Sequence, residues 1–143
     1  MSSSDGPPRG VTLERSFAAV PASAGAARAA LARFGRRNRL ADATIEAATL
    51  AVSEAVTNVV VHAYANRTER GDFRLTAAFA GSEFWVIVAD SGSGLQPRRD
   101  SPGLGLGLAI IARVADGVDL VTSAGGGLEI RMRFAVASAR TAG

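Results

Sequence analysis

The chain of 143 residues contains no lysine and no cysteine. Without lysine it cannot carry a P-loop, which ends in Gly-Lys-Ser/Thr, or the strand lysine of a eukaryotic-type protein kinase. Without cysteine it has no disulfide, no thiolate zinc site and no cysteine nucleophile. If this chain binds a nucleotide, backbone amides, arginines and a metal ion must therefore neutralise the phosphates.

Other features are scarce as well. The single histidine, His62, excludes a paired-histidine metal site. No apolar run reaches the ~18 residues that a membrane span needs, and residues 1–8 lack the charged-then-apolar order of a signal peptide. We therefore expect a soluble, cytoplasmic protein that does not contact a membrane. The basic residues are all arginines, and they are scattered, with the densest run at 36–39. Such a short run is typical of a solvated loop, so we expect no direct nucleic-acid partner.

The composition that remains is that of a globular domain. Hydrophobic residues make up 48% of the chain and charged residues 20%, a balance that allows one sizeable core. We expect one domain over residues 11–136. A polar, disordered tail at 1–10 precedes it and a short tail at 137–143 follows it.

Apolar periodicity predicts the element order β-α-α-β-β-loop-α-β-β. The expected strands cover 11–18, 73–79, 84–89, 118–122 and 128–134, and the expected helices cover 23–34, 42–64 and 106–115. Ser23 and Asp42 are the expected N-caps, and Gly35 is the expected end of the first helix. Adjacent hairpins with helices in separate blocks predict an α+β two-layer sandwich. Its sheet is mixed and mostly antiparallel, with the helices on one face.

The helix expected at 42–64 has two opposed faces. Valines form an apolar stripe, while Glu54, Asn58 and His62 recur every four residues along a second face. A carboxylate, an amide and an imidazole in one row are groups that handle a proton and a metal ion. An amphipathic helix with a mixed polar face explains the same row, and the helix alone leaves both interpretations open.

Glycines gather on both sides of a long loop at 91–105. One group follows the buried strand as Asp90-Ser-Gly92-Ser-Gly94, and the other enters the next helix as Gly103-Leu-Gly105-Leu-Gly107. Glycines let a backbone approach a ligand closely, and a helix N-terminus attracts anions, so this loop suits phosphates. A flexible turn remains the alternative. Asp90 either solvates the turn or accepts a hydrogen bond from an exocyclic amine such as that of adenine.

These segments together resemble a known family. The helix sequence LAVSEAVTNVVVHAY (50–64), VADSGSG (88–94), GLGLAII (105–111) and ADGV (115–118) resemble the anti-sigma factor serine/threonine kinases. These small proteins of the GHKL (Bergerat-fold) ATPase superfamily act in bacterial partner switching. The resemblance covers about residues 11–134 and implies the Bergerat ATP-binding fold, with ATP and Mg²⁺ as cofactors.

The resemblance implies a role for each motif residue. Asn58 would hold Mg²⁺ against the phosphates, Glu54 would be the general base, and Asp90 would read adenine. Gly92 and Gly94 would let the base lie close, Gly103, Gly105 and Gly107 would lie on the phosphate side, and the loop between them would be an ATP lid. His62 is expected to be structural. Arg98 and Arg99 in that loop either reach the γ-phosphate or remain solvated.

The implied activity is phosphorylation of a serine or threonine on a STAS-domain anti-anti-sigma protein by a homodimer that also sequesters a sigma factor. One departure from the family pattern lies in the last hairpin, where Gly127-Leu128 stands in place of the usual Gly-Thr. This departure favours an alternative, a non-catalytic module of the same fold in which nucleotide only gates partner binding.

Overall fold

One antiparallel sheet forms the base of the molecule. The structure is a computed structural model that describes residues 12–60, 71–90, 104–122 and 127–136. Within these residues five strands pair in the order β1-β2-β3-β5-β4. The strands are β1 (Thr12–Ala18), β2 (Asp72–Ala80), β3 (Glu83–Asp90), β4 (Gly117–Thr122) and β5 (Leu128–Ala135). Each of their pairings is antiparallel.

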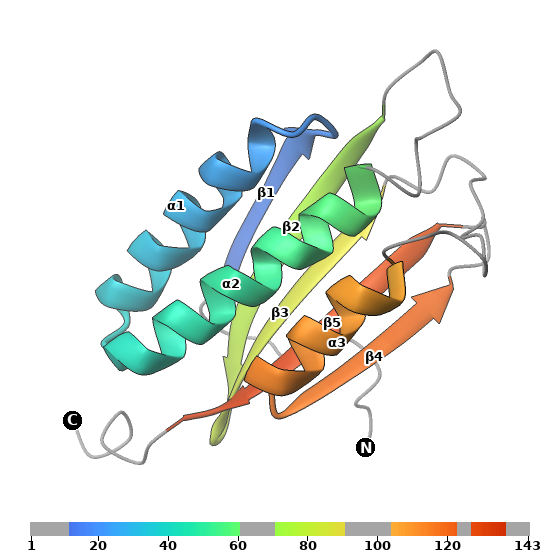
Figure 1. Cartoon of the computed structure of the whole chain (residues 1–143). Helices are drawn as coiled ribbons and strands as arrows, with labels where there is room; N and C mark the ends of the chain where they lie inside the picture. The colour runs from blue at the N-terminus through green and yellow to red at the C-terminus, as the bar shows by residue number, and fades with distance from the viewer. Residues whose placement is uncertain (1–11, 61–70, 91–103, 123–126, 137–143) are drawn as a thin grey trace.

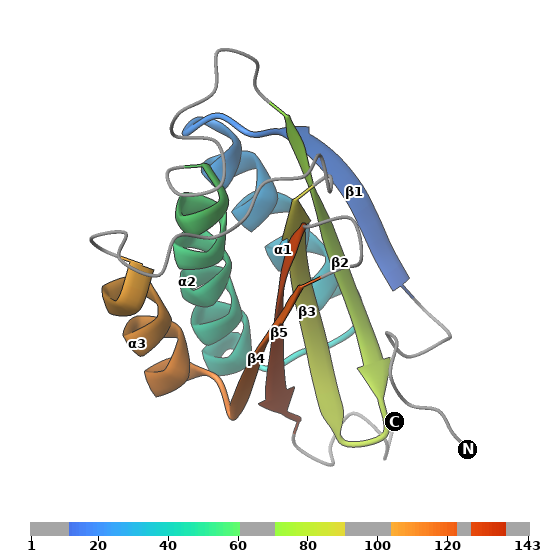
Figure 2. The same cartoon turned by 90° about the vertical axis from the view of Figure 1, so that its right-hand side faces the viewer.

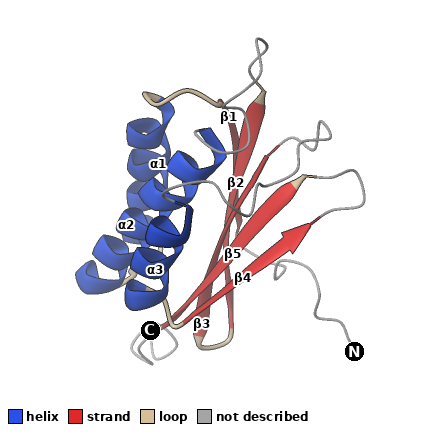
Figure 3. Cartoon of the chain, turned by 45° about the vertical axis from the view of Figure 1, so that its right-hand side comes forward, coloured by secondary structure: helices blue, strands red, loops and turns tan. Residues whose placement is uncertain are grey.

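Three helices cover one face of this sheet in the described part of the chain. They are α1 (Ser23–Arg37), α2 (Asp42–Asn58) and α3 (Leu104–Val114), and α2 lies between the other two (Figure 1). Views from the side show one helical layer and one layer of strands (Figures 2 and 3). The predicted α+β two-layer sandwich is therefore confirmed.

The core lies between the two layers, and the alternation of the strands creates it. Every second residue of β2, β3 and β5 faces the helices, and these side chains are buried: Phe73, Leu75, Phe84, Val86, Val88, Ile130, Met132 and Phe134. The helices contribute Phe34 from α1 and Val52 and Val56 from α2. Phe34 stacks on Phe79 with 5.9 Å between the ring centroids, so α1 is anchored to the sheet through aromatic contacts.

The sequence had predicted that Gly35 ends the first helix, and this prediction is wrong. It lies inside α1, which continues to Arg37, and it is buried. A Cβ atom at this position would lie 3.0 Å from Cγ1 of Ile45 on α2. The glycine therefore serves the close approach of two helices. The left-handed residue beyond the helix end is Arg39, with φ 62°.

Helix starts also differ slightly from the sequence predictions. Ser23 and Asp42 are the first helical residues rather than N-caps, because Ala22 and Ala41 occupy the cap positions without side-chain cap bonds. The third helix begins at Leu104, two residues earlier than expected, so Gly105 lies within it. The expected end of the central helix at residue 64 lies outside the described residues. No helix in the described part of the chain is long and apolar enough to cross a membrane.

Candidate functional site

Ends of several elements meet at one end of the sandwich. The last turn of α2, the end of β3, the start of α3 and the start of β5 lie there together (Figure 1). Two polar side chains are buried among the described residues, Asn58 with 2% of its surface exposed and Asp90 with 8%. Both belong to this end. Burial of a polar group is unfavourable unless it is hydrogen-bonded, so the pair marks this end as a candidate site.

Asn58 is the last residue of α2. The helix continues into a π-helical turn at 59–60, an irregularity that is frequent at functional sites. The Nδ2 atom of Asn58 is buried and has no hydrogen-bond partner within the described part of the structure. An amide in this state has donor capacity that the described residues do not use.

Gly107 of α3 packs directly against this amide. A Cβ atom on Gly107 would lie 2.9 Å from Oδ1 and 3.2 Å from Nδ2 of Asn58. The structure therefore brings together two residues from separate motifs, both of which the resemblance places near the phosphates. The contact depends on how α2 and α3 cross, and nothing in the sequence indicates it.

Asp90 is the last residue of β3 and shares the inner face of the sheet with Phe84, Val86 and Val88. The backbone N–H of Leu128 donates a hydrogen bond to Oδ2 of Asp90 at 2.8 Å. The pairing of Ala89 with Glu129, continued by one residue, sets Leu128 opposite Asp90. The first residue of β5 thus orients the carboxylate.

Leu128 contributes to this site through its backbone. Its side chain is 6% exposed and belongs to the hydrophobic core. From the sequence alone, only the missing hydroxyl is evident at this position. A prediction of the β3–β5 register would have revealed the backbone donor, because that register places the two residues opposite each other.

Glu54 lies one turn before Asn58 on α2 and is half-buried. Residues four apart on a helix lie on the same face. Glu54 therefore lies on the same side of α2 as Asn58, one turn farther from the end of the helix. The structure therefore retains the arrangement of carboxylate and amide that the sequence had indicated for these two residues.

The start of α3 supplies backbone donors. Gly105 and Gly107 are the second and fourth residues of this helix, and only Gly105 had been expected in the loop before it. The first four N–H groups of a helix have no partner within it, and the helix dipole is positive at this end. Anions are therefore favoured here, and no lysine is required.

Several predicted site residues lie outside the described residues. They are His62, Gly92, Gly94, Arg98, Arg99 and Gly103. Their expected roles stay predictions.

Metal chemistry at this end is limited by the available ligands. The described residues contain no group of three or more histidine, aspartate, glutamate or cysteine side chains that could hold an ion. A magnesium ion needs few protein ligands, because it keeps several waters and binds substrate phosphates. The side-chain oxygen of one buried asparagine fits such an ion better than it fits a metal held by protein alone, and the Nδ2–H groups, which have no partner among the described residues, could donate to a phosphate oxygen.

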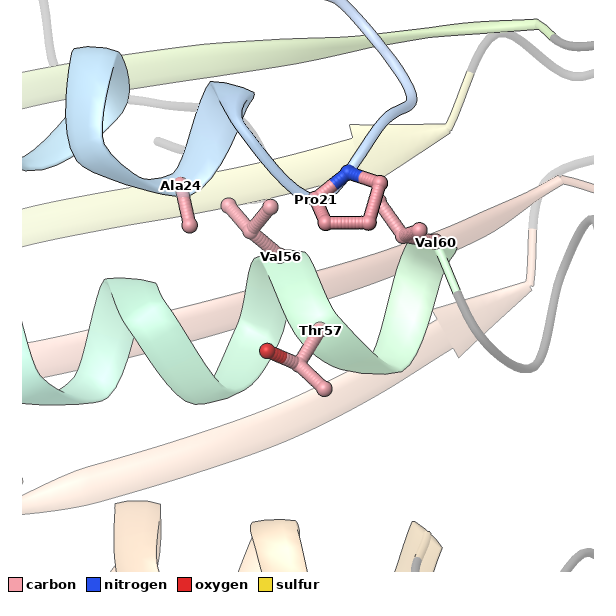
Figure 4. A pocket seen from close by; sticks show the side chains of 5 residues that line it. All are labelled: Pro21, Ala24, Val56, Thr57 and Val60. Carbon is pink, nitrogen blue, oxygen red and sulfur yellow. The ribbon is translucent and has the colours of Figure 1, made fainter.

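An apolar hollow lies between the start of α1 and the end of α2. It is lined by Pro21, Ala24, Val56, Thr57 and Val60 (Figure 4). Its volume of about 80 Å³ is well below the ~300–1,000 Å³ of typical small-molecule pockets. This hollow therefore cannot hold a nucleotide.

Comparisons with known proteins report on the family and the fold. Residues 17–134 match the family described as the histidine kinase-like ATPase domain. Two anti-sigma F factors each align with 57% of this chain, and the aligned residues are 30% identical. They come from Thermoanaerobacter sp. (strain X514) and Thermoanaerobacter pseudethanolicus (strain ATCC 33223 / 39E). These matches span 64% of each relative's own length.

A solved structure shares the fold. The crystal structure of the RsbU and RsbW domains of Rv1364c from Mycobacterium tuberculosis superposes with a TM-score of 0.70 at 23% identity. The match covers 89% of this chain and 33% of that one.

Proposed function

The chain belongs to the family of histidine kinase-like ATPase domains, and we propose that it binds ATP at the end of the sandwich where Asn58 and Asp90 are buried. The burial of these two polar side chains carries the proposal. Both were selected from the sequence as nucleotide contacts, and no other polar side chain in the described part of the chain is buried. The nucleotide-binding domain corresponds to residues 11–136.

Asp90 reads the base in this proposal. An ionised carboxylate accepts hydrogen bonds and has about four acceptor sites. The bond from the Leu128 amide fixes the orientation of the group without exhausting these sites. The carboxylate therefore suits the exocyclic amine of adenine and disfavours a carbonyl oxygen, such as that of guanine, in the same place.

Asn58 holds Mg²⁺ with the phosphates. A side-chain amide oxygen is a hard ligand of the kind that this ion prefers. When bound, Mg²⁺ neutralises phosphate charge, which matters in a chain without lysine. The N-terminal amides of α3 lie beside Asn58 through the Gly107 contact, and they would bind phosphate oxygens directly.

Glu54 serves as the general base in the kinase that we propose. Phosphoryl transfer depends mainly on positioning and charge neutralisation, and a carboxylate within reach of the acceptor orients its hydroxyl and takes its proton. The resemblance to the anti-sigma factor serine/threonine kinases implies a protein substrate, and the two relatives are named anti-sigma F factors. The acceptor in this proposal is a serine or threonine of a STAS-domain anti-anti-sigma protein.

Labelling of the partner tests this activity. The chain is incubated with Mg-ATP and its cognate STAS-domain protein, and phosphate transfer is followed over time. We expect Glu54→Gln to lower the rate by about 10²- to 10⁴-fold, the usual contribution of a general base. Glu46→Gln is the matched control, because Glu46 lies two turns earlier on α2 and is exposed.

The outcomes separate the kinase from its alternative. Undiminished labelling by Glu54→Gln would remove the base from the mechanism. Partner binding that requires nucleotide, without transfer at long times in the wild type, would instead establish the non-catalytic module. The aliphatic Leu128 is the observation that favours this second function.

A sigma factor is the proposed second partner, bound by a homodimer of this chain in the cytoplasm. The names of the two curated relatives support the sigma factor. Light scattering of the chain with and without the cognate sigma factor tests both the homodimer and its complex with the sigma factor. The mass of a monomer, or no complex in the presence of nucleotide, would contradict this assignment.

A further inference from the structure

The contact between Gly107 and Asn58 is unusually specific. A Cβ atom built on Gly107 would meet Oδ1, Nδ2 and Cγ of Asn58 at 2.9, 3.2 and 3.4 Å. All three of these nearest atoms belong to the same amide group. The space that a side chain at position 107 would need is therefore the space that the Asn58 amide occupies.

The orientation of the Asn58 amide depends on packing against Gly107. Asn58 is 2% exposed, and its Nδ2 atom has no hydrogen-bond partner in the part of the chain that the structure describes. A buried amide is ordinarily held by bonds from both of its polar atoms. Here the backbone of Gly107 forms a wall against the group.

We propose that Gly107 is a positioning residue. By lacking a side chain, it leaves the Asn58 amide in the orientation that magnesium–nucleotide binding requires. The inference rests on the proposed function, because it assumes that Asn58 takes part in magnesium binding. It differs from a role in phosphate contact, because a phosphate contact would use the backbone N–H at position 107, and alanine retains that N–H.

The energetics favour a displaced amide over a displaced helix when a methyl group is added. Ile111 of α3 is completely buried, and Leu108 packs against the core, so the helix is anchored directly after its first turn. The amide lies at the end of a side chain with two rotatable bonds. Alanine at position 107 should therefore preserve the fold and misplace Asn58.

Calorimetry with ADP tests this effect in the full chain. The dissociation constant of ADP is measured with MgCl₂ and with EDTA, and the ratio of the two values gives the magnesium-dependent gain in affinity. We expect Gly107→Ala to reduce this gain by about 10- to 100-fold, as changes in groups that orient a metal ligand do. Its binding of ADP in EDTA should change little.

Gly25→Ala is the matched control. Gly25 is the third residue of α1, and a Cβ atom there would have its nearest contact at 3.7 Å, with Nη2 of Arg28. This variant should retain the full magnesium-dependent gain. A Gly107→Ala protein with the same gain as the wild type would overturn the proposal.

The Asn58→Ala background gives a second test. Once the amide is removed, Gly107→Ala should cause no additional loss, and the double variant should fold because the crowding is relieved. A further loss of magnesium-dependent affinity in the double variant would show that Gly107 acts by another route and would overturn the proposal.

NMR of the ligand-free protein separates this inference from the proposed function. The side-chain NH₂ resonances of Asn58 should shift in Gly107→Ala and stay in place in Gly25→Ala. If the wild type bound no ADP, the proposed function would fail, while this shift would still report the contact. Unchanged Asn58 resonances in Gly107→Ala would refute the positioning role.

Discussion

Asn58 and Asp90 are both buried polar side chains, but among the described residues the Asp90 carboxylate has a hydrogen-bond partner and the Nδ2 atom of Asn58 has none. A buried polar group without a partner costs about 1–3 kcal/mol of stability. The backbone N–H of Leu128 offsets this cost for Asp90. The Nδ2 atom of Asn58 has no such offset from the described residues. A ligand that bonds this amide would recover the lost free energy on binding.

Asp90→Asn should separate base recognition from stability. The asparagine oxygen can still accept the Leu128 N–H, so we expect the free energy of unfolding to stay within about 1 kcal/mol of the wild type. The amide NH₂ would then oppose the adenine amine, and ADP affinity should fall by about tenfold or more, the effect of a lost charge-assisted bond. Urea denaturation and calorimetry measure the two quantities.

Two further variants complete this experiment. Asp90→Ala leaves the Leu128 N–H without its acceptor and should destabilise the fold by about 1–3 kcal/mol. Asp116→Asn is the control, because the Asp116 carboxylate likewise accepts a backbone N–H, that of Ala135 at 2.6 Å, but lies at the other end of β5. Equal ADP affinity for Asp90→Asn and the wild type would refute the role of Asp90.

Sequence patterns identified the residues of the candidate site more readily than their contacts. The spacing of Glu54 and Asn58 and the place of Asp90 after an apolar strand are local patterns, so residue types and periodicity predict them. The donor to Asp90 is a backbone atom 38 residues away along the chain. The Gly107 contact depends on the approach of two helices. No local pattern encodes either feature.

The pairing of α1 and α2 depends on a close approach at Gly35. Side chains of Ile45 and Leu40 fill the space beside this glycine, with atoms 3.0 to 3.2 Å from where a Cβ would lie. A glycine followed by polar residues resembles a helix end in sequence, which explains why α1 was expected to stop there. Tertiary packing overrides that signal.

Gly35→Ala should therefore destabilise the fold. Overpacking in a well-packed core costs about 1–3 kcal/mol, which exceeds the gain of about 1 kcal/mol expected from helix propensity. Urea denaturation measures the difference, with Gly25→Ala as the helical control. A net gain in stability for Gly35→Ala would show that the two helices separate at little cost.

Strands were predicted well, and their order was not. Alternation of apolar residues marks each strand, and short turns mark the hairpins β2–β3 and β4–β5. The pairing of β1 with β2, and the place of β5 between β3 and β4, join segments that are distant in sequence. Such pairings depend on how the strands together bury the sheet face that packs against the helices. The sequence of a single strand does not indicate which strand lies beside it.

At the scale of the whole molecule, the residues of the candidate site occupy one end and the bulk of the core lies behind them. Backbone ends of α2, α3, β3 and β5 converge there (Figure 1). A site built from element ends uses backbone amides and a few short side chains. Such a site would let a chain of 16 arginines and no lysine bind phosphates, as we propose.

Thermal unfolding with nucleotide tests the central claim, that this end of the molecule binds a magnesium nucleotide, most directly. The chain is heated alone and with ADP or ATP, each in MgCl₂ and in EDTA, with Asn58→Ala in parallel. Ligand at about 100 times its Kd should add about 2.7 kcal/mol of stability. We expect a rise in Tm with either nucleotide that is larger with magnesium, and we expect Asn58→Ala to lose the magnesium-dependent part. An unchanged Tm with both nucleotides, with and without magnesium, would contradict the account.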